Sequence, residues 1–205
     1  MNRSCVRRLL ALGLLVPWLS TGCDSEDSPE EDPPSGDAGI PDGGPGTPDG
    51  GETLSQFARD MLDGHNATRA AAKPVPSPAL VPVTWDTEAE NTAKAYAAKC
   101  EFKHNPNRGN LGENLYAATP DSKTTRAVVE GWSSEINDYN YATNSCAQTK
   151  MCGHYTQIVW RNTKRIGCAT QVCTENSPWG AQWPKWQLWV CNYAPPGNYV
   201  GERPY

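Results

Sequence analysis

Six cysteines between residues 100 and 191 constrain the fold of this chain more than any other sequence feature. They are Cys100, Cys146, Cys152, Cys168, Cys173 and Cys191. An even set of cysteines in an exported domain indicates disulfides, whereas a reduced set would indicate a zinc cluster. The spacings lack a pair of Cys-x-x-Cys motifs, so we favour three disulfides. Spacing alone does not say which cysteines pair.

The first 22 residues have the pattern of an export signal. Arg3, Arg7 and Arg8 precede an apolar run over residues 9–16 that is too short to cross a bilayer as a helix. The Leu-Ser-Thr-Gly-Cys sequence ending at Cys23 resembles a bacterial lipobox, which predicts that Cys23 is lipidated and anchors the chain to a membrane. Because Ser20 stands where a lipobox usually has an aliphatic residue, cleavage near Gly22 and release of a free secreted protein is the alternative.

Residues 23–52 predict a disordered linker behind that cysteine. Between residues 24 and 52 there are ten Asp or Glu, no Lys or Arg, and one large aliphatic side chain, Ile40. Such a segment cannot bury enough apolar surface to offset the entropy of ordering, and its prolines and like charges keep it extended. Residues 53–205 carry fifteen Lys or Arg against thirteen Asp or Glu. This near-neutral domain has no charge pattern that indicates nucleic-acid binding.

The pattern of residues 53–205 predicts a single α+β domain. Helical spacing of apolar residues predicts helices over 54–72, from Thr87 towards Cys100, and over 124–136. Thr87-Glu88-Ala89-Glu90 fits a capping box at the start of the second helix. Short strands are expected over 114–117, 165–173 and 186–193. This order of elements indicates a small antiparallel sheet packed between helices.

The stretch 152–163 combines a cysteine, a histidine and an apolar stripe. Tyr155, Ile158, Val159 and Asn162 recur at helical spacing, and His154 borders that stripe. A histidine placed there can titrate or bind a metal, or can be a hydrogen-bonded group of the core. The stretch alone does not distinguish these roles.

Several segments together resemble the CAP superfamily of cysteine-rich secretory proteins, antigen 5 and pathogenesis-related-one proteins. The two longest matches are residues 153–163 and 188–199, and the shorter ones are His65-Asn66-x-x-Arg69, Trp85-Asp86, Gly112-Glu113-Asn114-Leu115 and residues 132–139. The likeness covers essentially all of residues 55–205. It is greatest to the plant pathogenesis-related-one branch, which has matching cysteines and a similar ending at residues 201–205.

The resemblance implies an α-β-α sandwich with a central cleft that often binds Zn²⁺ or another divalent ion. Matched residue by residue, the cleft would contain His104, His154, Glu113 and Glu135. Without the resemblance, Glu113 would be expected to bond backbone amides and Glu135 to lie on a solvated helix face. The plant branch also implies the disulfides Cys100–Cys152, Cys146–Cys168 and Cys173–Cys191. His65 is expected to have a structural role.

The resemblance favours a monomeric, extracellular or membrane-anchored binding module for sterol, another lipid or another extracellular ligand. A zinc-dependent hydrolase that uses Glu113 or Glu135 is the alternative, although no Ser or Cys nucleophile and no His-Glu-x-x-His helix is evident. Strand alternation places Trp186 and Leu188 on the opposite face from Trp189. The Pro- and Gly-rich tail from Pro195 to Tyr205 either packs on the domain or resembles a segment that plant relatives are thought to release.

Overall fold

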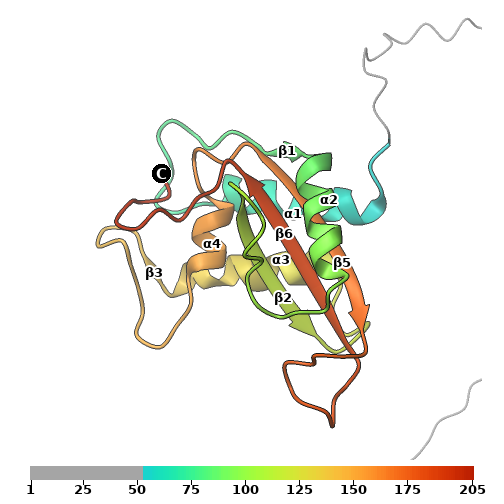
Figure 1. The fold of residues 1–205 in the computed structure, drawn as a ribbon. Helices are drawn as coiled ribbons and strands as arrows, with labels where there is room; N and C mark the ends of the chain where they lie inside the picture. The colour runs from blue at the N-terminus through green and yellow to red at the C-terminus, as the bar shows by residue number, and fades with distance from the viewer. Residues whose placement is uncertain (1–52) are drawn as a thin grey trace, which may run out of the picture. The chain divides into compact units, whose positions relative to one another are not determined.

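The computed structural model describes residues 53–205, so the predicted export signal, Cys23 and the linker lie outside the described residues. The elements, shown in Figure 1, are α1 (Gln56–Ala70), β1 (Thr84–Trp85), α2 (Thr87–Ala97), β2 (Gly112–Ala118), α3 (Thr125–Ser133), the 3-10 helix η1 (Ser134–Asn137), β3 (Tyr139–Asn140), β4 (Ser145–Cys146), α4 (Gly153–Ile158), β5 (Arg165–Cys173) and β6 (Trp186–Ala194). This confirms the α+β class.

A four-stranded sheet with the order β1-β5-β6-β2 forms the middle layer. β5, β6 and β2 are antiparallel, as predicted, whereas β1 is a short parallel edge strand that the sequence pattern did not reveal. In Figure 1, α2 lies across one face of this sheet, and α1 and α3 lie on the other. The fold is therefore the α-β-α sandwich that the resemblance implied.

Alternation along β6 divides the core into two halves. Trp186, Leu188 and Val190 pack with α2, while Trp189 and Tyr193 pack with α1, α3 and α4. This confirms the predicted opposite facing of Trp186 and Trp189, because successive side chains of a strand point to opposite faces. Among the described residues, both core halves, the helices and strands and the three disulfides belong to one compact unit. We therefore expect residues 53–205 to fold by themselves.

Two of the expected helix limits were wrong. α2 is capped by Asp86, whose carboxylate accepts a hydrogen bond of 2.9 Å from the amide of Ala89. Glu90 does not close a capping box, since its carboxylate accepts from the Trp85 indole instead. α4 ends at Ile158, and Asn162 is exposed rather than part of a helical stripe.

Arg69 explains the early end of α4. The buried Arg69 guanidinium donates hydrogen bonds to the carbonyls of Ile158 at 2.9 Å and Trp160 at 2.8 Å. A further bond from its Nε reaches the Val81 carbonyl at 3.0 Å. These bonds replace the intrahelical partners that the last carbonyls of a helix lack.

The disulfide pairing implied by the plant branch was wrong at all three bonds. The structure instead joins Cys100–Cys173, Cys146–Cys152 and Cys168–Cys191. Cys168 and Cys191 are register partners on β5 and β6, with their Cα atoms 4.1 Å apart. Cys173 lies five residues further along β5, about 16 Å away at strand spacing. This exceeds the Cα separation of about 7 Å that a disulfide can bridge, so Cys173–Cys191 cannot form.

The C-terminal tail packs on the domain. The Arg161 amide donates to the Pro204 carbonyl at 2.7 Å, and Arg203 donates to the carbonyls of Tyr141 and Ala142. The Tyr205 ring stacks on Tyr141 with ring centroids 4.7 Å apart. Within residues 53–205, no helix has the length and apolar character needed to cross a membrane.

Candidate metal centre

Glu135 holds His154 at the start of α4. Its Oε1 lies 2.5 Å from Nδ1 of His154, and its Oε2 accepts from the backbone amides of His154 at 2.9 Å and Tyr155 at 3.1 Å. The Glu135 side chain is only 13% exposed, so the interpretation as a solvated helix residue was wrong. The carboxylate satisfies two of the amides that every helix start leaves free. The His154 ring also stacks on Trp132, with centroids 6.1 Å apart.

Glu113 holds His104 in a second pair. His104 lies in the loop after α2, and Glu113 lies on β2. Oε1 of Glu113 accepts from His104 Nδ1 at 2.8 Å and from the Asn105 amide at 2.9 Å. Glu113 therefore has both the backbone amide partner expected from the sequence alone and the histidine partner. Oε2 of Glu113 is buried and has no hydrogen-bond partner among the described residues.

The two pairs meet at one pocket of about 270 Å³. His104, Glu113, Asn114 and His154 line it, together with Met151, Cys152, Gly153 and Asn198. Glu135 does not line the pocket and instead supports His154. The fold therefore brings three of the four predicted residues to a common cavity and places the fourth directly behind a histidine.

The hydrogen bonds fix which imidazole nitrogen is available. A carboxylate only accepts, so each neutral histidine carries its proton on Nδ1 and leaves the Nε2 lone pair free. Within residues 53–205, no group of three or more His, Cys, Asp or Glu side chains lies close enough to hold a metal ion by itself. A cation in this pocket would have to complete its coordination with water or another ligand. The donors present, two imidazole nitrogens and the unpaired oxygen of Glu113, are of types that Zn²⁺ accepts.

His65 lies in the core and not in the pocket. Its Nδ1 bonds the Met61 carbonyl at 2.7 Å, and its Nε2 bonds the Tyr193 hydroxyl at 2.8 Å. Burial lowers the pKa of His65 from 6.5 to about 4. The structural role expected for this histidine agrees with these contacts.

Asn114 and Tyr193 connect that core histidine to the pocket. The Asn114 amide donates to the Tyr193 hydroxyl at 2.9 Å and to the His154 carbonyl at 3.1 Å. Both residues lie inside segments that carried the resemblance, but sequence reasoning gave neither a role. The signal available in the sequence was a polar side chain directly after Glu113 and another two residues after Cys191.

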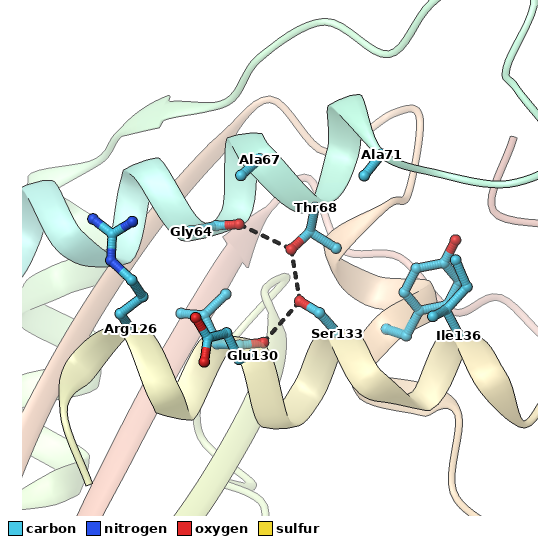
Figure 2. Close-up of a pocket in the computed structure, with 10 residues that line it drawn as sticks. Gly64, Ala67, Thr68, Ala71, Arg126, Glu130, Ser133 and Ile136 are labelled. Atoms are coloured by element: carbon cyan, nitrogen blue, oxygen red, sulfur yellow. Dashed lines mark hydrogen bonds between the residues drawn. The ribbon is translucent and has the colours of Figure 1, made fainter.

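A second cavity, of about 300 Å³, lies between α1 and α3 (Figure 2). Thr68 and Ser133 are both in its lining, and their hydroxyls form a hydrogen bond of 2.6 Å that joins the two helices. Each hydroxyl also bonds a carbonyl of its own helix. Thr68 reaches the Gly64 carbonyl at 2.9 Å, and Ser133 reaches the Val129 carbonyl at 2.7 Å. Because these hydroxyls are satisfied by each other and by the backbone, the groove offers a ligand mostly apolar contacts. Ala67, Ala71, Ile136 and Tyr155 contribute to its lining.

The fold and the site together define the class of this domain, a disulfide-bonded α-β-α sandwich with two histidine–carboxylate pairs at one pocket. The family model described as CAP, the cysteine-rich secretory protein family, matches residues 62–193. This chain therefore belongs to the CAP family.

Curated relatives include mammalian and plant proteins. Peptidase inhibitor 16 of Mus musculus is 43% identical over 145 residues, which cover 71% of this chain and 28% of that protein. The PR-1 type pathogenesis-related protein of Sambucus nigra is 43% identical over 151 residues, covering 72% of this chain and 81% of that protein. The chain thus spans less than a third of peptidase inhibitor 16 but most of the plant protein, which agrees with the predicted plant-like branch.

Solved structures show the same fold. Venom allergen-like protein 4 of Schistosoma mansoni superposes with a TM-score of 0.59 at 29% identity, covering 74% of this chain and 95% of that chain. NaASP2, solved with Zn²⁺, superposes with a TM-score of 0.56 at 27% identity, covering 78% and 90%.

Proposed function

We propose that this chain is an exported binding protein whose central pocket takes a divalent cation, Zn²⁺ in the first instance, through His104 and His154. The observation that carries the proposal is the pairing of both imidazoles, each through Nδ1, with a carboxylate. Histidines that bind metals usually donate their second ring N–H to such a partner, which fixes the ring and raises the basicity of the ligating nitrogen. The solved structure of NaASP2 with Zn²⁺ supports the choice of metal.

The two carboxylates have different tasks in this proposal. Glu135 uses both oxygens on His154 and the start of α4, so it orients a ligand rather than binding metal. Glu113 uses one oxygen on His104 and Asn105, and its other buried oxygen is available to the pocket. A cation there would supply a centre that polarises a bound ligand.

Zinc titration calorimetry at neutral pH tests the metal site. Zinc affinity should fall at least about tenfold in His104→Ala and in His154→Ala, because each loses one of two imidazole ligands. His65→Gln is the matched control, since it changes the only other histidine of the chain, and it should bind zinc as wild type does. Affinity should also weaken at mildly acidic pH, where protons compete for imidazole nitrogens. Equal zinc affinity in all four proteins would refute the site.

The groove of Figure 2 supports a second function, the binding of a sterol or another lipid. Ala67 lies on α1 in the lining, and a larger side chain there would fill part of the groove. Ala67→Phe should therefore reduce capture of a fluorescent sterol or fatty acid while zinc binding stays unchanged. Unchanged capture of both probes would exclude this groove as the lipid site.

The same proteins decide between binding and hydrolysis. If the pocket is a hydrolase site, peptide or ester turnover should require zinc and disappear in Glu113→Gln. We favour the binding module because a metal pocket does not by itself establish turnover. Membrane anchoring is tested separately, by mass spectrometry of the mature N-terminus for acylated Cys23.

A further inference from the structure

The loop between β5 and β6 exposes two tryptophans. In Figure 1 this loop, residues 174–185, projects beyond the end of the sheet. Trp179 is 45% exposed and Trp183 is 66% exposed, whereas Trp186 and Trp189 nearby are fully buried. The core therefore accounts for two of the four tryptophans in this region and leaves the other two without a role.

The loop holds these two side chains in an ordered backbone. The Gly180 amide donates to the Ser177 carbonyl and the Trp183 amide to the Gly180 carbonyl, both at 3.1 Å. At the base, the Trp186 indole donates to the Glu175 carbonyl at 2.7 Å. Gly180 has a φ of +88°, which a glycine adopts without strain. These turns fix the backbone from which the two partly exposed indoles project.

The loop itself carries no charged side chain at its tip. No charged residue lies between Glu175 and Lys185, and these two have opposite charge. Two further apolar side chains are exposed where β5 and β6 meet the loop. Phe102 is 45% exposed and packs its edge on Trp186, and Val172, next to Cys173 at the end of β5, is 41% exposed.

We propose that this loop docks on the surface of a phospholipid bilayer through Trp179 and Trp183. Indole rings favour the membrane–water interface, where the apolar ring and the polar N–H are both accommodated. An uncharged tip enters this region without the cost of desolvating a charge. Both tryptophans lie on the same projecting loop, four residues apart in the sequence, so docking of the loop tip would bring both to the bilayer.

A bilayer fits this loop better than a small glycan or a protein groove. The hollow in the loop, of about 340 Å³, is lined by Thr174, Glu175, Asn176, Ser177, Gly180, Ala181 and Pro184, and by neither tryptophan. The indoles therefore do not form the wall of a ligand pocket. The loop is also separate from the metal pocket. Asn192, the register partner of Glu113, lies six residues from Trp186 along β6, or about 20 Å.

The test uses residues 53–205, which omit Cys23 and so cannot carry the predicted lipid. Wild type should sediment with phosphatidylcholine vesicles, and brominated lipid should quench its tryptophan fluorescence. Trp179→Ala/Trp183→Ala should lower the partition coefficient about tenfold or more, because the variant lacks the two aromatic side chains whose transfer from water into the bilayer drives binding. Trp179→Phe/Trp183→Phe should retain most of the binding. Since the tip is uncharged, salt and added anionic lipid should change binding little.

Matched controls separate docking from general stickiness and misfolding. Val75→Ala/Val200→Ala removes smaller but more exposed apolar groups outside the loop, at 85% and 103% exposure, and should bind vesicles as wild type does. Each variant should keep three disulfides and its zinc affinity. The proposal is overturned if wild type does not bind vesicles at millimolar lipid, or if the double alanine variant binds as well as wild type. Binding of soluble oligosaccharide or a protein without vesicle binding would also overturn it.

Discussion

Protonation of His65 should couple the stability of this domain to mildly acidic pH. The Met61 carbonyl can only accept, so Nδ1 of His65 carries the proton and Nε2 accepts from the Tyr193 hydroxyl. The Tyr193 oxygen in turn accepts from the Asn114 amide. A second proton on His65 would turn Nε2 into a donor facing a hydroxyl that already receives one, and it would place a charge in the core near Arg69.

The shift in the pKa of His65 sets the size of the effect. Burial lowers this pKa from 6.5 to about 4, with a further contribution from the charge on Arg69, while the bond to Met61 opposes the shift. Between these two values the unfolded chain binds more protons than the folded chain, so stability rises with pH. The contribution is complete above about pH 6.5 and is lost as pH falls towards 4. At about 1.4 kcal/mol per pKa unit, it amounts to roughly 3 kcal/mol.

Urea unfolding at several pH values between 7 and 4 measures this contribution. Wild type should lose roughly 3 kcal/mol more than His65→Gln over this range, because the variant has nothing to protonate at this position. Asp86 and Glu90 also have lowered pKa values, but they are common to both proteins and cancel in the difference. Parallel stability curves for the two proteins would refute the assigned role of His65.

Substitutions at two disulfides, two glycines and Arg69 test the packing. Opening Cys100–Cys173 should lower the free energy of unfolding by about 4 kcal/mol, and opening Cys146–Cys152 by about 2 kcal/mol, because the sequence separations of 73 and 6 residues set the loop entropy. Urea unfolding of the two double Ser variants measures both losses. A larger loss for Cys146–Cys152 would contradict this reasoning. Gly167→Ala should destabilise the domain by about 3 kcal/mol or more, since the new Cβ would lie 2.1 Å from a backbone nitrogen of α2. Gly153→Ala is the control, because its Cβ would meet only a contact at 3.9 Å, and it should change the melting temperature little. Arg69→Lys should cost about 3 kcal/mol in the same assay, because a compact ammonium cannot span the three carbonyls on two segments that the guanidinium reaches. A wild-type midpoint would show that these bonds are dispensable.

Local periodicity was sufficient for the longer elements. The expected helices and the strands β5 and β6 agree with the structure within a few residues, since each has one apolar face that must be buried. β1 has only two residues, too few for a pattern, and is defined by pairing with β5. α4 ended early because a guanidinium from another helix satisfies its carbonyls. Neither effect is visible in the local sequence.

Disulfide pairing depended on register rather than on spacing. Cys168 and Cys191 are joined because β5 and β6 pair them directly, and a strand shifted by two residues would have offered Cys191 a different neighbour. Family resemblance supplied the four site residues but not their grouping into two His–Glu pairs. That grouping follows from where α2 ends and where α4 begins relative to the sheet.

The edge strand β2 explains why the two pairs meet. Successive residues on a strand face opposite sides, so Glu113 points to the α2 layer, where His104 lies, and Asn114 points to the layer that contains α4 and His154. Because β2 is the last strand of the sheet, histidines from both layers can reach the same pocket around its edge. The register of Asn114 opposite Cys191 therefore fixes both halves of the site at once. A slip of one residue would exchange the faces of Glu113 and Asn114 and separate both histidines from their partners.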